Sequence, residues 1–431
     1  MESKIVDDPP KILRIICQRP FFTGSGVNLI ELIKQTKKAG FEQFIIFGHP
    51  IGEPYPLNKI IDPKFTLPVY FDNEMTSEKG EINFPVAGMS DRMPYDSTRF
   101  SEFDEKMLET YLSVFARKIN KAIKIFDPNI IHSHHLWLIT ALCRVLHPKL
   151  PILGTCHNTA LRQLVLANQL RNFTKPIKYL NAISVLNDNQ KQLVKKAFNF
   201  KNLEVENKFY VVGTGFNTDI FYHLKQQKKS LHKKIIYVGK LSKAKGVPEL
   251  IKAIQELLKE SNLDFELLLA GSGAGEEKDQ ILELSKGHKN KIRFLGQLNQ
   301  QALAKYFREC ELFILPSYFE GLPSVLIESL ACGCNAIVTD LPGIKETITS
   351  TCGEFDQISY LPLPKMNSID QPFEEDIEFF IKKIKEAIQY QLNQEKLANA
   401  NPIIPEKIKS NFSWKAIFEK YLEIYTKLLK Y

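Results

Sequence analysis

The sequence predicts an α/β protein built from two doubly wound domains, and three observations support this prediction. Short apolar runs alternate with amphipathic helical segments along most of the chain, the rhythm of a parallel sheet with helices on both faces. This rhythm closes near residue 213 and restarts at Lys234. The length of 431 residues exceeds what one ordinary core needs, so two domains are expected.

The first domain is expected over residues 1–213. Its first predicted strand covers residues 11–17, and a helix over residues 27–39 follows and ends near Gly40. A longer helix is expected over residues 101–124. The remaining apolar runs of this half predict strands at 44–48, 129–134, 151–157, 182–185 and 209–213.

A linker is expected over residues 214–231 and a second domain over 232–400. This domain begins with a predicted strand at 234–239 and a helix at 247–260; further strands are expected at 265–271, 292–296, 312–315 and 336–340. Residues 352–371 carry several prolines without a clear period, so we interpret them as a surface excursion. Apolar residues at helical spacing predict a terminal amphipathic helix over 412–431, expected to cross back to the first domain.

The composition is that of an ordinary soluble globular protein, with 44% hydrophobic and 25% charged residues. A net charge of +8 fits phosphate-bearing substrates or an anionic membrane surface, although solubility alone explains it. Seven scattered cysteines form no disulfide framework, and Cys332 and Cys334 lack the second pair that a zinc site needs. With no apolar leader and no stretch of membrane-spanning length, we expect a cytoplasmic protein with reduced thiols.

The segment 317–328 carries the most chemical information. It follows a short apolar run that ends at Pro316, and Pro323 suits the start of a helix. The free N–H groups and positive dipole end of that helix form a natural seat for an anion. Glu320 would lie at this mouth and Glu328 about one turn or more inside the helix. The pair suits a ligand with hydroxyls and phosphate, although these residues alone equally allow a dipole-complementing Glu320 and a surface Glu328.

Glycine and lysine residues follow the first strand of each half, where ligands bind in open α/β sheets. The turn at 23–27 opens a helix, and Gly26 permits close backbone approach to an anion. In the second half, Lys240 and Lys245 can deliver compact positive charges to a diphosphate. Taken singly, such a turn is weak evidence and such lysines are commonly solvated.

Histidines lie in or at the end of two predicted strands of the first domain. His157 ends the predicted strand 151–157, so it either faces a substrate or is a hydrogen-bonded structural residue. Alternation places His132 and His134 on one face of a strand, but no third metal ligand belongs with them. We therefore favour a role of His134 in acceptor binding or in the core. Arg162 could hold a carboxylate or phosphate of an acceptor.

Taken in this order, these segments resemble the retaining GT-B glycosyltransferases of family 4, the glycogen-synthase-like group 1. The resemblance covers most of the chain and is strongest over 234–348, where the paired-glutamate motif 320–328 is followed by matching segments at 331–333 and 341–346. It implies two Rossmann-like domains that face each other across a deep crevice.

The resemblance also implies roles for individual residues. Glu328 would bind the donor ribose, Glu320 would act near the donor sugar with His157 at the reaction centre, and Lys240 and Lys245 would hold the diphosphate. Gly26, Gly321 and Leu322 would add donor contacts, while His134 and Arg162 would contact the acceptor. Four positions depart from the family pattern. Lys240 replaces a common arginine and Ser25 a common glycine, and in the linker Thr214 and Asn217 replace the commoner asparagine and aspartate.

The implied activity is that of a retaining hexosyltransferase-type enzyme, which moves a sugar from a nucleoside diphosphate sugar to a glycan, a lipid-linked glycan or a small molecule. No metal, cofactor or nucleic acid is expected, and weak association with a membrane surface is left open. Two alternatives remain at this point: a sugar-nucleotide epimerase of the same fold, and a non-catalytic protein that binds nucleotide sugars.

Overall fold

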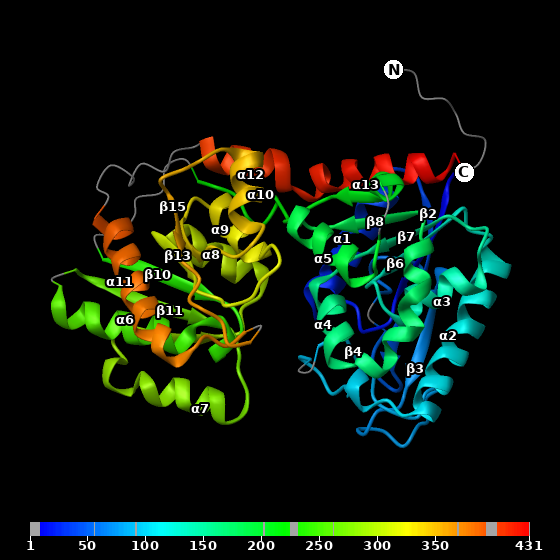
Figure 1. The fold of residues 1–431 in the computed structure, drawn as a ribbon, viewed down its shortest axis with the longest axis horizontal. Coiled ribbons are helices and arrows are strands. Elements are labelled where there is room, and N and C mark those ends of the chain that lie inside the picture. The colour runs from blue at the N-terminus through cyan, green and yellow to red at the C-terminus, as the bar shows by residue number, and fades with distance from the viewer. Residues whose placement is uncertain are drawn as a thin grey trace. The chain divides into compact units, whose positions relative to one another are not determined.

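A computed structural model describes residues 9–430 except 56, 91–92, 201–202, 225–231, 262, 369 and 394–402. The chain divides into two compact units (Figure 1). The N-terminal unit comprises the residues up to Gly213 together with those from Ile417 onward, and the C-terminal unit comprises Thr214–Ala416. Part of the predicted linker, residues 225–231, lies outside the described residues.

The N-terminal unit contains a seven-stranded parallel sheet with the order β3-β2-β1-β6-β7-β8-β9. Its strands are β1 (Lys11–Ile16), β2 (Glu42–Pro50), β3 (Thr66–Phe71), β6 (Ile130–His134), β7 (Ile152–Thr155), β8 (Ala182–Val185) and β9 (Phe209–Val211). The order reverses between β1 and β6. These strands are neighbours in the sheet although β1 ends at Ile16 and β6 begins at Ile130. Such a reversal is the topological switch point of a doubly wound sheet.

Alternation along β1 and β2 assigns side chains to the two faces of this sheet. Ile16 and Phe47 pack with Leu29 and Ile33 of α1 (Gly24–Lys38). Their neighbours Ile15 and Ile46, in contrast, belong to the larger core on the other face, to which α2 (Glu105–Phe126) and α3 (Leu138–Leu146) contribute. Because both faces are covered, the strands are apolar almost throughout.

Further helical segments connect β7, β8 and β9. They include α4 (Asn158–Leu166), the 3₁₀ segment η3 (Asn168–Tyr179) and α5 (Asp188–Ala197). Two short strands, β4 (Ala87–Gly88) and β5 (Thr98–Arg99), form a separate pair.

The final helix, α13 (Trp414–Leu428), begins in the C-terminal unit and continues in the N-terminal unit. Its start is capped by Ser413, whose hydroxyl accepts from Ala416 N at 3.2 Å. Tyr421 and Tyr425 are buried, with at most 1% of either exposed. The helix therefore supplies two large polar-tipped side chains to the core of the N-terminal unit.

The C-terminal unit contains a six-stranded parallel sheet with the order β12-β11-β10-β13-β14-β15. Its strands are β10 (Lys233–Val238), β11 (Phe265–Ala270), β12 (Ile292–Gly296), β13 (Leu312–Leu315), β14 (Asn335–Thr339) and β15 (Ile358–Leu361). The switch point lies between β10 and β13.

Helices cover both faces of this second sheet (Figure 1). On one side α6 (Val247–Glu260) packs against α11 (Ile377–Asn393), and on the other α8 (Gln300–Glu309) packs against α9 (Ser324–Ala331). The unit is completed by α7 (Gly275–Leu284), α10 (Ile344–Cys352) and α12 (Ile403–Phe412). The predicted α/β class with two doubly wound parallel sheets is confirmed.

Three details differ from the sequence-based expectations. The interpretation of 352–371 as a surface excursion is wrong in part, because β15 adds an edge strand there. The edge strand β3 was not predicted, and it tolerates Pro68 because an edge strand does not need every N–H for the ladder. In addition, α1 begins at Gly24, so Gly26 lies within its first turn rather than before it.

We expect Gly246→Ala to destabilise the C-terminal unit by about 2 kcal/mol more than Gly275→Ala. Both glycines have nearly the same positive φ, +65° and +64°, so both variants incur the left-handed strain of an L-residue, about 1 kcal/mol. A Cβ at Gly246 would also lie 2.1 Å from Pro316 O, whereas nothing lies within 4 Å of one at Gly275. Urea unfolding of both variants measures the difference, and equal losses would contradict the importance of this close approach.

Candidate functional site

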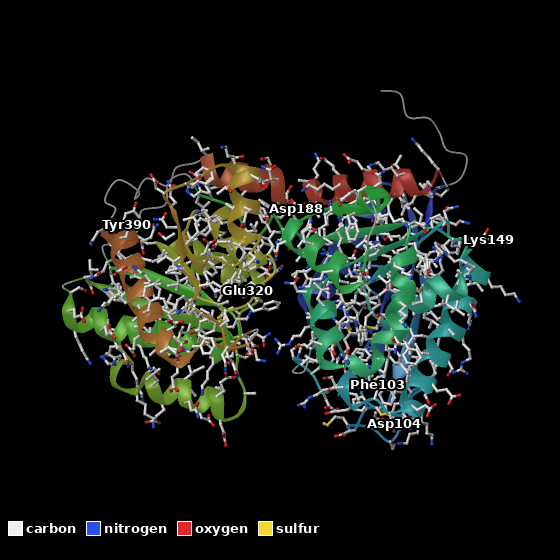
Figure 2. All side chains as sticks on the ribbon, in the orientation of Figure 1. Phe103, Asp104, Lys149, Asp188, Glu320 and Tyr390 are labelled. Atoms are coloured by element: carbon white, nitrogen blue, oxygen red, sulfur yellow. The ribbon has the colours of Figure 1, made fainter. Side chains whose placement is uncertain are left out.

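The loops that follow β10 and β13 carry the candidate residues of the C-terminal unit. These two strands are adjacent and parallel, so their carboxyl ends lie at the same edge of the sheet. Lys240 follows β10 and is exposed, and Lys245 ends the short 3₁₀ segment η5 (Lys243–Lys245). Glu320, labelled in Figure 2, lies in the loop between β13 and α9. The switch point thus gathers positive and negative groups from distant parts of the sequence.

Lys245 and Glu320 are in direct contact. Lys245 Nζ lies 2.6 Å from Glu320 Oε1 and also donates to Phe319 O at 3.3 Å. Ser317 Oγ donates to the same Glu320 oxygen at 2.9 Å. The two side chains are partly shielded, with 26% and 18% of their surfaces exposed. Charge-assisted bonds of this kind fix the carboxylate and the ammonium in one place before a ligand arrives.

Backbone packing holds the two loops together. Gly246 approaches Pro316 so closely that a side chain has no room there, and Tyr318 N donates to Ala244 O at 3.1 Å. Tyr237, on β10, donates from its hydroxyl to Lys240 O at 2.6 Å and is fully buried. Sequence reasoning missed Tyr237, because an aromatic residue in a strand gives no signal of a polar task.

Glu328 is a buried carboxylate in the second turn of α9. Only 8% of the residue is exposed, and burial raises the pKa of its carboxyl group to about 7. Among the described residues no side-chain hydrogen bond or ion pair to Glu328 is found. Ionising a buried carboxylate is costly without donors, so this residue is suited to a ligand that brings hydroxyl groups to it.

Gly321 and Leu322 lie between the two glutamates. Gly321 is partly exposed in the turn, whereas Leu322 is 5% exposed and its side chain belongs to the core. The roles that were predicted for these two residues remain predictions.

In the N-terminal unit, Gly26 is required by the chain's own backbone. Thr23 caps α1 by accepting from Gly26 N at 3.2 Å. A Cβ at Gly26 would lie 2.7 Å from Phe21 N, and Phe21 has a φ of +78°. The tight turn after β1 therefore already explains this glycine, and its contact with a diphosphate remains a prediction.

His157 and His134 come together at the edge formed by β6 and β7. His157 is the N-cap residue of α4 and is partly exposed, and its Nε2 lies 3.3 Å from His134 Nδ1. Loss of solvation on burial lowers the pKa of the His157 imidazole to about 4. His134 is 2% exposed and shares the stacked geometry, with ring centroids 5.6 Å apart and planes at 12°. Both imidazoles are therefore neutral at physiological pH.

Two neighbouring side chains complete this edge. His135 packs its ring 4.7 Å from that of His157 and has a φ of +69°, an uncommon conformation for a residue with a side chain. Within the described residues, Nε2 of His134 and of His135 has no hydrogen-bond partner. Arg162 lies in the second turn of α4 and is partly exposed. Acceptor binding by His134 and Arg162 stays a prediction.

The described residues contain no group of three or more His, Cys, Asp or Glu side chains arranged to hold a metal ion. No helix in that part of the chain is both long and apolar enough to cross a membrane.

Comparisons with known proteins agree with this arrangement. Residues 218–352 match the family described as glycosyl transferases group 1. An N-acetyl-alpha-D-glucosaminyl L-malate synthase from Bacillus anthracis is 28% identical over 76% of this chain and 79% of its own length. An uncharacterised glycosyltransferase from Methanocaldococcus jannaschii is 25% identical over 70% of this chain and 76% of its own. A second protein of that organism is 32% identical, but the chain covers only 29% of its length.

Solved structures match over nearly the whole chain. A sucrose-phosphate synthase from Thermosynechococcus elongatus has a TM-score of 0.71 at 17% identity and covers 98% of this chain and 99% of its own. Anabaena HepE in complex with UDP and glucose has a TM-score of 0.61 at 14% identity, with 97% and 100% covered. At such identities these structures support the fold alone. The sequence matches relate residues 218–352 to the group 1 glycosyl transferases, and the solved structures show that the chain has the GT-B fold.

Proposed function

We propose that this protein transfers a sugar from a nucleoside diphosphate sugar to an acceptor hydroxyl, with retention of the anomeric configuration. Glu328 carries the proposal, because it is a buried carboxylate with no partner among the described residues. Glu328 lies in the second turn of α9, and the loop before this helix carries Glu320, which pairs with Lys245. The hydrogen bond from Tyr318 N to Ala244 O packs this loop against the loop that carries Lys245. A vicinal diol donates two hydroxyls to one carboxylate, and a diphosphate binds lysines and helix N-termini.

The donor would exchange contacts with the protein as it binds. Lys245 neutralises Glu320 in the absence of donor. A partly exposed ion pair contributes little free energy, so a doubly charged diphosphate can attract Lys245 at low cost. Lys240 would add a second positive charge, and Glu320 would then accept a hydrogen bond from a hydroxyl of the donor sugar. These lysines would stabilise the departing diphosphate, where negative charge develops in the transition state.

The N-terminal unit would supply the reaction centre and the acceptor contacts. His157 is neutral and partly exposed, so it can exchange hydrogen bonds with hydroxyls of the donor sugar or of the acceptor. Arg162 and His134 are the proposed acceptor contacts, and Gly26 the proposed approach to the diphosphate. Several structural relatives were solved with UDP, which supports a uridine nucleotide as the first donor to test. The acceptor would be a glycan, a lipid-linked glycan or a small molecule.

The donor can be identified with a panel of UDP-glucose, UDP-N-acetylglucosamine, ADP-glucose and GDP-mannose. We expect one of them to raise the melting temperature of the protein, because a ligand that binds the folded state stabilises it, and to be hydrolysed slowly. Lys245→Ala should slow this turnover on the order of 100-fold, as removal of one stabiliser of developing charge does. Lys243→Ala removes an exposed lysine of the same turn and should have little effect.

The same assay separates the alternatives. Release of nucleoside diphosphate and free sugar supports a transferase, an epimerised nucleotide sugar would identify an epimerase, and stabilisation without any turnover would identify a binding protein. Equal turnover in Lys245→Ala and Lys243→Ala would exclude the proposed role of Lys245.

We expect donor affinity to depend on pH through Glu328. Because the carboxyl group has a pKa of about 7 and only the carboxylate accepts both ribose hydroxyls, affinity should rise between pH 6 and pH 8, by up to about tenfold. Calorimetry at several pH values measures this affinity with the nucleotide sugar that the panel selects. A free nucleoside diphosphate is not used, because its terminal phosphate titrates in the same pH range. Glu328→Gln should bind more weakly at pH 8 and lose the pH dependence, and a variant with an unchanged pH profile would refute the assignment.

The same shift gives a stability signature of opposite sign. Glu328 titrates near 4.5 when unperturbed and near 7 in the folded protein, so the folded state holds the extra proton between these values. The free energy of unfolding should therefore fall as pH rises from about 4.5 to 7. Glu328→Gln should reduce this fall, which urea unfolding at several pH values will measure.

Tyr237→Phe should weaken donor binding about fivefold, which corresponds to the roughly 1 kcal/mol that one buried hydrogen bond contributes. The variant leaves the ring in place but removes the bond from the hydroxyl to Lys240 O. Tyr390→Phe, at an exposed position of α11 labelled in Figure 2, removes the same atom as a control. If both variants bind donor like the unmodified protein, Tyr237 does not position the Lys240 loop.

A further inference from the structure

Arg14 is a fully buried cation in the middle of β1, with 0% of its surface exposed. On the face of the sheet covered by α1, it donates from Nε to Gln43 Oε1 at 2.7 Å and from one terminal nitrogen to Thr36 Oγ1 at 2.6 Å. Its other terminal nitrogen lies 2.8 Å from His132 Nδ1. No carboxylate pairs with it in the described part of the chain. The guanidinium is therefore held by neutral partners, and its charge acts on the imidazole beside it.

These contacts determine the tautomer of His132. A guanidinium nitrogen can only donate a hydrogen bond, so His132 Nδ1 must be the acceptor and carries no proton. Burial, and after it the charge of Arg14, hold the pKa of His132 well below its usual range, which keeps the ring neutral. Its single proton then sits on Nε2 and is donated to Thr155 Oγ1 at 2.7 Å.

Tyr425 of α13 also contacts the side chain of His132 through a hydrogen bond. Its hydroxyl lies 2.8 Å from His132 Nδ1, and because that nitrogen is unprotonated the hydroxyl must be the donor. The Arg14 guanidinium also lies over the Tyr425 ring, 5.8 Å from its centroid. The last helix of the chain thus shares, with Arg14, the one acceptor that fixes this imidazole.

Two routes lead from His132 to His157. The first is a stack of rings: His132 lies on His134 with centroids 4.7 Å apart and planes at 20°, and His134 Nδ1 contacts His157 Nε2 at 3.3 Å. The second runs through the chain, because Thr155 is the last residue of β7 and His157 follows two residues later. The contacts of His132 therefore constrain both the ring of His157 and the backbone that carries it.

We infer that His132 and Tyr425 are positioning residues for His157: the Tyr425 hydroxyl and Arg14 hold His132 in one tautomer and orientation, and His132 holds His157 through His134 and Thr155. The inference about catalysis rests on the proposed role of His157, whereas the coupling of the three rings does not. A neutral imidazole must present a chosen nitrogen in a chosen direction to act on a hydroxyl, and a displacement near 1 Å can cost on the order of 100-fold in rate.

The last helix also provides a matched control. Tyr421 lies one turn before Tyr425, is equally buried, and packs its ring 5.5 Å from that of His132. Among the described residues, its hydroxyl contacts Thr155 Oγ1 and Ser184 Oγ alone, both at 3.4 Å, which is too long for a strong O–H···O bond. Tyr421→Phe and Tyr425→Phe thus remove the same atom from the same buried helix face, but only the second removes a donor to His132.

The test is long-range ¹⁵N–¹H correlation NMR of the histidine side chains in the full-length protein, with signals assigned by single His→Asn variants. We expect His132 to carry its proton on Nε2, the signals of His132, His134 and His157 to shift in Tyr425→Phe, and the His157 signals to stay in place in Tyr421→Phe. Thermal unfolding of both variants verifies that each is folded. A proton on His132 Nδ1, unmoved His157 signals in Tyr425→Phe, or equal shifts in both variants would overturn the inference.

Turnover of the most active nucleotide sugar of the panel then tests the link to catalysis. Tyr425→Phe should lower kcat about tenfold with an unchanged KM for the donor, and Tyr421→Phe should retain wild-type kcat. If the NMR pattern holds but kcat is equal in the two variants, the positioning does not serve the reaction and that part of the inference is wrong. If the unmodified protein turns over no nucleotide sugar, the proposed function fails while the ring coupling stands.

Discussion

The close approach of Gly246 to Pro316 is the contact on which the candidate donor site depends. It brings the loop after β10 against the loop after β13, so that Lys245 meets Glu320 across 75 positions of sequence. A Cβ cannot fit at this point because backbone, rather than a movable side chain, occupies the space. The hydrogen bond from Tyr318 N to Ala244 O then fixes the same pair of loops. Charge and hydrogen bonding at the site follow from this packing.

Both units place polar side chains at the point where the strand order of a parallel sheet reverses. The two units differ in how these buried polar groups are stabilised. In the C-terminal unit an ion pair lies at the partly exposed edge, while Glu328 is buried without a described partner and has a raised pKa. In the N-terminal unit His132, His134 and His135 are buried and neutral, and Arg14 is satisfied by neutral acceptors. The C-terminal edge thus carries charged side chains, whereas the N-terminal edge presents uncharged imidazole rings.

The predictability of each element followed from how local its cause is. Strand β13 is buried along its whole length and therefore appears as a continuous apolar run, and β1 and β10 are apolar at most of their positions. The edge strands β3 and β15 were missed because their sequences include proline or lie in a proline-rich segment, and only pairing with a neighbour makes them strands. The order of the glutamate, lysine and glycine motifs was likewise visible, since each follows its strand directly.

The sequence by itself determined the α/β class, the two-fold repetition of the strand–helix rhythm, and the residues that resemble the group 1 glycosyltransferases. It could not assign Tyr237, Arg14 or Tyr425, because each is an ordinary strand or helix residue whose partner is distant along the chain. Tertiary structure alone decided that Gly26 is needed by its own turn, that His134 contacts His157, and that the last helix donates to His132. The physical reason is that hydrogen-bond partners and steric limits are set by three-dimensional neighbours, whereas apolar periodicity is set by the local chain.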